Sequence, residues 1–231
     1  MTEHHHRDIH GGVARAAVFG ASDGLVSNVS LILGVAGADP GASFVRLAGL
    51  AGLIAGAVSM AAGEYGSMKA QAELLERELA IERRELARNP HVETVELSQL
   101  YQSRGVDPDL AHQLAQGVMV DPDTALRAHA REELGIDPDA LGSPVLAAVS
   151  SFFSFALGAV LPLLPWFVTS GSGAVLASVL LGIAGAAGLG VALARFTMGS
   201  PVRLALRYTA IAVLAGAVTY GIGSVVGVST A

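Results

Sequence analysis

Residues 49–89 read GLAGLIAGAVSMAAGEYGSMKAQAELLERELAIERRELARN, and they change from apolar to charged at Lys69. Before Lys69 the residues are small or apolar, and Glu64 carries the only charge. After Lys69 come strong helix formers with Glu and Arg three or four residues apart, a pattern that stabilises a helix in water. Because no helix breaker precedes Asn89 and Pro90, the stretch predicts one helix that crosses a membrane and continues into water.

Four further apolar stretches are long enough to cross a bilayer, which needs about 20 mostly apolar residues. Residues 16–38 contain one charge, Asp23, and residues 208–231 contain none. Residues 144–194 also contain none, and they break at the TSGSG of 169–173 into two spans. The first span is longer than the apolar part of a secretory signal and is therefore permanent. We predict an all-α membrane protein with five transmembrane helices.

The basic residues predict the orientation of these spans. Thirteen of the 14 Lys and Arg residues lie in the N-terminal tail, in 69–143 or in 195–207, and only Arg46 lies elsewhere. Because basic loops stay in the cytoplasm, the N-terminus is expected inside and the C-terminus on the opposite side. The expected parts are a cytoplasmic tail at 1–14, two spans at 15–68, a cytoplasmic domain at 69–143 and three spans at 144–231.

The charged domain differs in kind from the rest of the chain. Residues 66–142 carry 15 acidic and 8 basic residues, a net charge of −7, whereas the whole chain has −6. Two or three short helices are expected after Asn89, one of them at about 92–104. The other two should start at the Asp-Pro-Asp triplets of 107–109 and 121–123, because Asp caps a helix and Pro suits its first turn.

Three pairs in this domain would place metal-binding groups on one face of a helix. They are Glu82 with Glu85, Glu93 with Glu96, and His129 with Glu133. Carboxylates on one face repel each other unless a cation lies between them. Carboxylate oxygen with imidazole nitrogen suits divalent Mn, Fe or Zn better than Cu(I). The alternative interpretation is a solvated acidic surface.

Asp23 is out of place in an apolar span, because a charge at the bilayer centre costs about 2.5–3.5 kcal/mol. At 1.5 Å per residue from the cytoplasmic ends, Asp23 lies about 10 Å deep and Met60 about 12 Å deep, so the two should be level. Glu64 lies one turn closer to the cytoplasm on the face of Met60. These three residues would form a short column of polar side chains that leads toward the charged domain. The alternatives are an Asp23 that lies in the headgroups or bonds to Ser22 or Ser27, and a Met60 that only packs.

Small residues also recur in the second span. Gly49, Gly52, Gly56, Ser59 and Gly63 lie close to one stripe, which lets helix backbones approach closely. The stripe predicts either packing within the chain or the seam of a homodimer.

Four stretches of the chain are distinctive when taken together. They are FGASDGLVSNVSLILGVAG at 19–37, IAGAVSMAAGEY at 54–65, ERELAIERRELARNP at 76–90 and FFSFALGAVLPLLPWF at 152–167. In this order they resemble the vacuolar iron transporter family, related to the iron and manganese carriers of yeast and plant vacuoles. The resemblance covers the chain from about Arg15 to the C-terminus.

This resemblance implies a homodimer of five-span subunits with a metal path along the dimer interface. It implies that Asp23 and Met60 are metal ligands within the membrane. The ligands that it implies in a cytoplasmic metal-binding domain are Glu82, Glu85, Glu93, Glu96 and Glu133. The implied activity is export of Fe²⁺, and often Mn²⁺, from the cytosol in exchange for protons.

The chain departs from the family pattern at two places. Characterised eukaryotic members have methionines before the last domain glutamate, where this chain has His129 and Ala130. Some members carry an acid about two turns before the second-span methionine, where this chain has Gly52. The sequence therefore leaves open the metal preference and the residue that couples protons.

Several classes of protein are not expected from the sequence. It contains no cysteine, which excludes disulfides and thiolate metal sites. No nucleophile with a neighbouring base, no phosphate-binding loop and no nucleic-acid patch is visible, so we expect neither an enzyme nor a nucleic-acid-binding protein, and no cofactor.

The leading hypothesis is a proton-coupled Fe²⁺ and Mn²⁺ carrier in a bacterial plasma membrane, since no organelle-targeting signal is visible. One alternative is a membrane-anchored metal-binding or regulatory protein without flux, and another is a carrier of a different cation. The histidines His4, His5, His6 and His10 form either part of a disordered tail or an additional metal collector.

Overall fold

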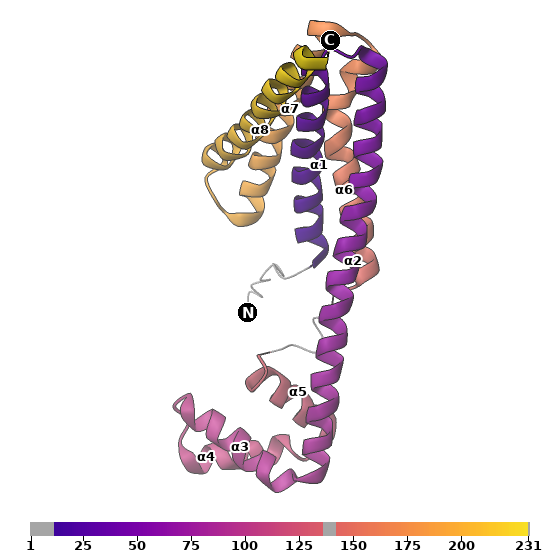
Figure 1. The fold of residues 1–231 in the computed structure, drawn as a ribbon. Coiled ribbons are helices and arrows are strands. Elements are labelled where there is room, and N and C mark those ends of the chain that lie inside the picture. Colours follow the sequence, from indigo (N-terminus) through magenta and orange to yellow (C-terminus); the bar gives the residue numbers. More distant parts are fainter. Residues whose placement is uncertain (1–11, 136–141, 231) are drawn as a thin grey trace. The chain divides into compact units, whose positions relative to one another are not determined.

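The computed structural model describes residues 12–135 and 142–230, and every regular element in these ranges is a helix (Figure 1). The chain divides into two compact units. We call them the membrane unit, within Met1–Ser67 and Ser143–Ala231, and the inserted unit, within Met68–Gly142. The all-α fold class predicted from the sequence is confirmed.

Five helices are long and apolar enough to cross a membrane, as the hydropathy pattern predicted. They are α1 (Gly12–Gly37), α2 (Ala42–Arg88), α6 (Pro144–Leu163), which the 3₁₀ helix η2 (Leu164–Phe167) extends, α7 (Gly171–Thr197) and α8 (Pro201–Thr230). The α2 helix is continuous over 47 residues and ends immediately before Asn89, so the predicted passage from apolar to charged sequence within one helix is also confirmed.

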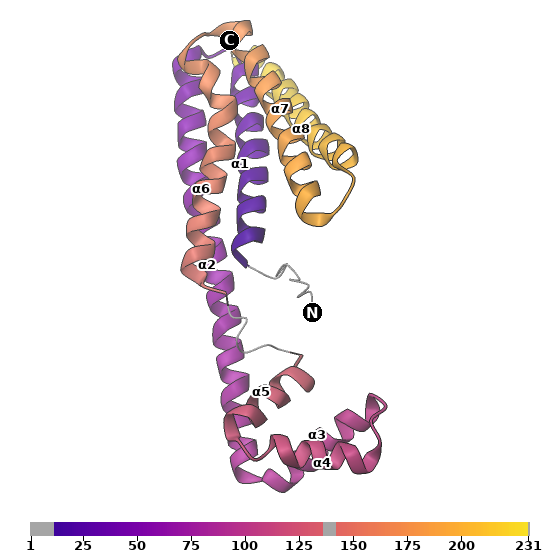
Figure 2. The ribbon, with the colours of Figure 1, turned by 180° about the vertical axis from the view of Figure 1, so that it is seen from behind.

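The α1 helix is the centre of the membrane unit, because it packs against α6, α7 and α8 (Figures 1 and 2). Its contact with α6 joins two backbones. A Cβ atom added at Gly24 would collide with the Phe155 carbonyl, and one added at Gly158 would collide with the Ala21 carbonyl. On the α8 side, a Cβ atom at Gly223 would collide with the Gly34 carbonyl. Glycine is therefore required for these helices to approach as closely as they do.

The glycines of α2 contact side chains of the same chain. A Cβ atom at Gly49 would lie 3.2 Å from Ile32 Cγ1, and one at Gly52 would lie 2.9 Å from Asn28 Oδ1. At Gly56 the neighbouring group is the Phe155 ring. The first half of the stripe thus packs within the chain, whereas no atom lies within 4 Å of a Cβ at Gly63.

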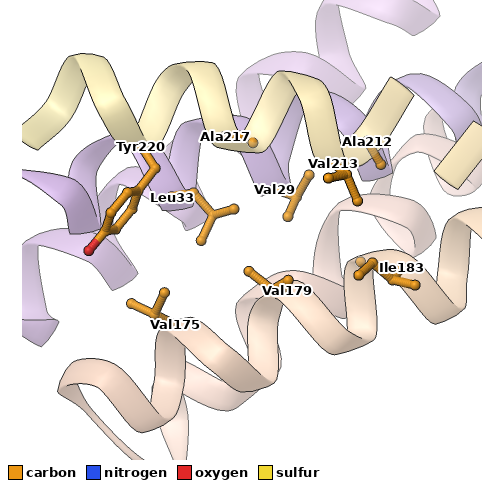
Figure 3. Close-up of a pocket in the computed structure, with 11 residues that line it drawn as sticks. Val29, Leu33, Val175, Val179, Ile183, Ala212, Val213, Ala217 and Tyr220 are labelled. Carbon is orange, nitrogen blue, oxygen red and sulfur yellow. The ribbon is translucent and has the colours of Figure 1, made fainter. Parts of the chain in front are cut away.

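A cavity of about 270 Å³ lies between α1, α7 and α8 (Figure 3). Val29 and Leu33 line it from α1, and Val179 and Ile183 line it from α7. The Tyr220 hydroxyl is the only polar side-chain group among the lining residues. Because divalent cations need several oxygen, nitrogen or sulfur ligands, this cavity is unsuited to a metal ion.

The inserted unit consists of the charged part of α2 and three short helices, α3 (Pro90–Ser103), α4 (Pro108–Val118) and α5 (Pro122–Glu132). The two predicted Asp-Pro-Asp starts are confirmed, with each helix beginning at the proline. Asp107 accepts hydrogen bonds from the backbone N–H groups of Asp109 and Leu110, and Asp121 accepts one from that of Thr124. These caps satisfy amide groups that the first turn leaves unpaired.

Candidate metal-binding sites

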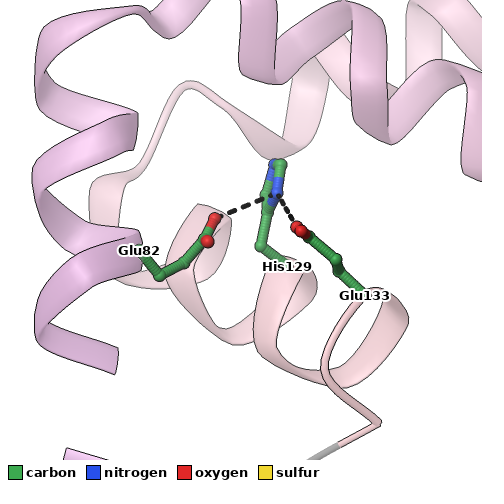
Figure 4. A group of neighbouring side chains, drawn as sticks. All are labelled: Glu82, His129 and Glu133. Carbon is green, nitrogen blue, oxygen red and sulfur yellow. Dashed lines mark ion pairs between the residues drawn. The ribbon is translucent and has the colours of Figure 1, made fainter. Parts of the chain in front are cut away.

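Three carboxylates surround the His129 imidazole inside the inserted unit, and Figure 4 shows two of them, those of Glu82 and Glu133. His129 Nδ1 lies 3.1 Å from Glu82 Oε1, 3.8 Å from Glu93 Oε2 and 3.6 Å from Glu133 Oε2. Ligand atoms of Glu82, His129 and Glu133 all lie within 4.8 Å of one another. We call Glu82, Glu93, His129 and Glu133 the acidic cluster. These four groups could contribute three oxygen ligands and one nitrogen ligand to one cation.

Helical periodicity brings these polar groups to positions that normally hold core residues. Glu93 lies one turn before the fully buried Leu97 on α3, and His129 lies one turn after the buried Ala125 on α5. On α2, Glu82 lies two turns after the buried Leu75. Each of the three faces is therefore directed into the interior of the unit, where an unpaired charge is costly.

Several polar atoms of the acidic cluster are buried and form no hydrogen bond with any residue in the described ranges 12–135 and 142–230. They are both ring nitrogens of His129 and Oε1 of Glu82. His129 Nδ1 and Glu82 Oε1 are close enough for a hydrogen bond but are not aligned for one. Buried polar atoms without partners are rare in proteins and call for an explanation. The Glu82 oxygen and the His129 nitrogen both carry lone pairs. A cation between these two atoms would be more favourable than their direct contact.

The acidic cluster also perturbs its own ionisation. Burial, followed by the charges of Glu133, Glu93, Glu85 and Glu96, raises the pKa of Glu82 from its usual 4.5 to about 7. Burial likewise raises the pKa of Glu93, although His129 partly opposes this. A proton therefore occupies the site more readily than it occupies a free carboxyl group, and a metal ion that binds must displace it.

We expect the inserted unit without metal to lose stability as the pH rises from about 4.5 to about 7. In this range the folded state retains a proton on Glu82 that the unfolded chain has released, so unfolding becomes easier by at most about 1.4 kcal/mol per pH unit. Hydrogen exchange of α5 in the chelator-treated full-length protein, corrected for the intrinsic exchange rate, measures this change. The Glu82→Gln variant should show a smaller pH dependence, and a stability that increases over this range would contradict the expectation.

The other predicted ligands of this unit lie at its edge. Glu85 and Glu96 are exposed, and they act on Glu82 through their charge. Next to Glu133, Glu132 forms an ion pair with Arg104, which follows α3. This ion pair connects the C-terminal end of α5 to the C-terminal end of α3. Glu85, Glu96 and Glu133 are thus exposed to solvent, whereas Glu82, Glu93 and His129 are buried.

Within the membrane unit, Asp23 is exposed on the surface of the single chain. Its Oδ1 accepts a hydrogen bond of 2.8 Å from the hydroxyl of Ser27, one turn further along α1. The neighbouring Asn28 is buried instead, and its Nδ2 donates to the Ala159 carbonyl at 2.6 Å. Adjacent polar residues of α1 thus face different environments. The side chains of Asp23 and Ser27 are exposed at the surface of the chain, whereas Asn28 is buried.

Met60 and Asp23 are predicted to lie at the same depth. The Arg15–Glu64 ion pair and the approach of Gly52 to Asn28 show that α1 and α2 run antiparallel, and they place Met60 within about one helical turn of the position opposite Asp23. The equal depth of the two side chains stays a prediction. Met60 is half-buried against Ala57, Phe155 and Ala159. Its side chain therefore contributes to packing within the membrane unit.

Glu64 has a partner that the sequence reasoning missed. Arg15 Nη2 donates to Glu64 Oε1 at 2.8 Å. A signal for Arg15 exists in the sequence, because a basic residue in the first turn of a helix is disfavoured by the helix dipole and needs a compensating partner. The N-terminal histidines His4–His6 and His10 lie outside the described residues.

The fold defines a multi-pass membrane protein with acidic residues in α1 and α2 and a cluster of carboxylates and imidazole in an inserted helical unit. The chain belongs to the VIT family, whose sequence profile matches residues 14–224.

Named relatives from plants and an amoeba cover nearly the whole chain. It is 39% identical over 219 residues to the Vacuolar iron transporter of Acanthamoeba castellanii, with 92% of this chain and 78% of that protein covered. It is 31% identical over 229 residues to Vacuolar iron transporter 1 of Oryza sativa subsp. japonica, with 97% and 91% covered. Vacuolar iron transporter 1 of Arabidopsis thaliana is 29% identical over 226 residues, with 96% and 90% covered.

Proposed function

We propose that this protein exports Fe²⁺ and Mn²⁺ from the cytosol in exchange for protons, and that it acts as a homodimer. The names of its relatives support iron as a cargo and support transport rather than catalysis. The inserted unit collects the ion, and Glu64, Met60 and Asp23 conduct it through the membrane unit.

The acidic cluster is the observation that carries the choice of cargo. Its ligands are carboxylate oxygens and the imidazole of His129, without sulfur. Such ligands favour divalent ions such as Fe²⁺, Mn²⁺ and Zn²⁺ over Cu(I). Because the site lacks thiolate, the ion is held without the affinity that would prevent its release. The surrounding net charge of −7 in residues 66–142 further raises the local cation concentration.

The exposure of Asp23 supports the homodimer. In one chain this carboxylate would face lipid, where a charge is costly. A second copy packed against the same surface would cover it and bring two Asp23 side chains together around a shared path. Ser59 and Gly63 lie at the end of the stripe of small residues on α2. This part of the stripe remains available for such a contact.

The distribution of basic residues supports a cytoplasmic N-terminus and a cytoplasmic inserted unit, with the C-terminus on the opposite side. We place the protein in a bacterial plasma membrane. Its relatives are named for the vacuole, and both locations correspond to movement of metal out of the cytosol.

The proposal is tested by metal flux into proteoliposomes with an acidic interior. Fe²⁺ or Mn²⁺ should accumulate inside while protons leave, because a gradient of one pH unit supplies about 1.4 kcal/mol per proton exchanged. Collapse of the pH gradient by an ionophore should reduce uptake to that of protein-free vesicles. Uptake that does not depend on the gradient would rule out the proton exchange while leaving metal transport in place.

The same preparation decides between transport and a membrane-anchored metal-binding protein. If metal binds to the purified protein but crosses the vesicle membrane in neither direction, the result favours a membrane-anchored metal-binding protein. Uptake of an organic cation that competes with Mn²⁺ favours a carrier of a different cargo. Parallel measurements with Fe²⁺ and Mn²⁺ rank the two metals.

A further inference from the structure

The ion pair between Arg15 and Glu64 joins two side chains that are buried to very different degrees in the single chain. The Arg15 side chain is 55% exposed, whereas only 17% of the Glu64 side chain is exposed. A carboxylate in this position is partly desolvated and depends on a nearby cation. Its partner, in contrast, lies mostly at the surface of the chain and is packed less tightly.

The dipole of α1 does not favour a cation at this place. Arg15 lies in the first turn of a helix that begins at Gly12. Unpaired backbone N–H groups give that end a partial positive charge, which disfavours a guanidinium there. The pairing with Glu64 is a favourable interaction that offsets this cost.

The ion pair is also not needed to hold this end of α1 in place. The Ser150 hydroxyl donates to the Val13 carbonyl at 3.2 Å and connects the beginning of α1 to α6. The close approach at Gly20, where a Cβ atom would lie 2.7 Å from the Ser151 carbonyl oxygen, fixes the next turn. The beginning of α1 thus remains attached to α6 when Arg15 releases Glu64.

We propose that Arg15 is a displaceable counter-ion that occupies Glu64 until a divalent cation such as Fe²⁺ or Mn²⁺ takes its place. This inference rests on the proposed metal transport. A divalent ion brings twice the charge of the guanidinium to the Glu64 carboxylate. The ion therefore displaces the Arg15 side chain from Glu64. When the ion moves on toward Met60 and Asp23, Arg15 returns to Glu64 and opposes backward movement. Arg15 is thus a positioning residue that binds no metal itself.

Mn²⁺ binding to the full-length protein, followed by electron paramagnetic resonance, tests the proposal. The acidic cluster is first disabled by Glu82→Gln, His129→Gln and Glu133→Gln, so that the sites of the membrane unit dominate. In this background Arg15→Gln should tighten Mn²⁺ binding about three- to tenfold, because the competing guanidinium is gone. The gain should disappear when Glu64→Gln is added.

The matched control is Arg203→Gln, which removes the same charge from the first turn of another membrane helix, α8. It should leave Mn²⁺ binding unchanged. Unchanged or weaker binding in Arg15→Gln overturns the proposal, and so does equal tightening in Arg203→Gln.

Two further measurements separate the remaining explanations. If Arg15→Gln does not fold, Arg15→Lys retains the charge but not the forked contact and should tighten Mn²⁺ binding by a smaller factor. Weaker Mn²⁺ binding in Arg15→Lys than in the protein with Arg15 would show that the forked contact holds the site together, which would make Arg15 a structural brace and overturn the proposal. Flux of the unmodified protein is measured alongside. Mn²⁺ binding that responds to Arg15 without any flux would contradict the transport function and not the role of Arg15 as counter-ion.

Discussion

Asp23→Asn is expected to reduce the flux of Fe²⁺ into proteoliposomes by about a hundredfold or more, because the loss of about 3 kcal/mol of charge stabilisation at a transport site corresponds to that factor. The substitution keeps the size of the side chain and an oxygen that accepts from Ser27. It removes only the negative charge. The measurement is the initial rate of Fe²⁺ uptake at a fixed amount of reconstituted protein.

Two control variants isolate the role of this charge. Asp39→Asn removes the acid of the turn between α1 and α2 and should keep nearly the full rate, since Asp39 lies outside the helices that span the membrane. Ser27→Ala removes the donor to Asp23 Oδ1 and should lower the rate less than tenfold, as expected for a single hydrogen bond to a charged group worth about 1–2 kcal/mol. An Asp23→Asn protein that retains half of the unsubstituted rate would exclude Asp23 from the path.

Gly24→Ala is expected to have the second large effect, on folding rather than on flux. The new Cβ atom would collide with the Phe155 carbonyl oxygen and lie 2.8 Å from its carbonyl carbon. Backbone atoms cannot rotate away, so α1 and α6 must separate. Overpacking of this kind costs about 1–3 kcal/mol, which for a chain of this size corresponds to a drop in Tm of about 10 °C at the upper end.

The matched variant is Gly221→Ala on α8, where no atom lies within 4 Å of the added Cβ. Alanine favours a helix over glycine by about 1 kcal/mol, so this variant should keep or raise the Tm. Thermal unfolding of both proteins in detergent, followed by size-exclusion chromatography, measures the difference. Equal Tm values for the two variants would show that α1 and α6 tolerate a wider separation.

The fold could be predicted largely from the sequence because its main signals are local. Long uncharged runs identify membrane spans whatever their neighbours are, and the absence of a breaker before Asn89 predicted the length of α2. Asp107 and Asp121 cap the helices that follow them in sequence. The contacts between glycine and carbonyl groups in α1, α6 and α8 could not be predicted, because each depends on a residue far away in the chain.

The candidate sites were predictable to the extent that they follow helical spacing. His129 and Glu133 lie four residues apart and converge as expected, whereas the approach of Glu82 to both required the tertiary structure. Arg15, the partner of Glu64, lies 49 residues away from it in the sequence. No helical spacing predicts a contact between these two residues. The depth estimate for Asp23 and Met60 assumed equal starting levels for the two helices. Their actual register depends on contacts such as that between Gly52 and Asn28.

The contacts between backbones around α1 have a consequence for how the membrane unit can move. A contact between two backbones contains no rotamer that can absorb a displacement, so we expect α1, α6 and α8 to move together. The α2 helix meets these helices through side chains such as those of Leu31, Ile32 and Phe155. Packed helices with side-chain contacts can slide past each other by small shear steps. We therefore expect a displacement within the membrane unit to move Met60 and Glu64 relative to Asp23.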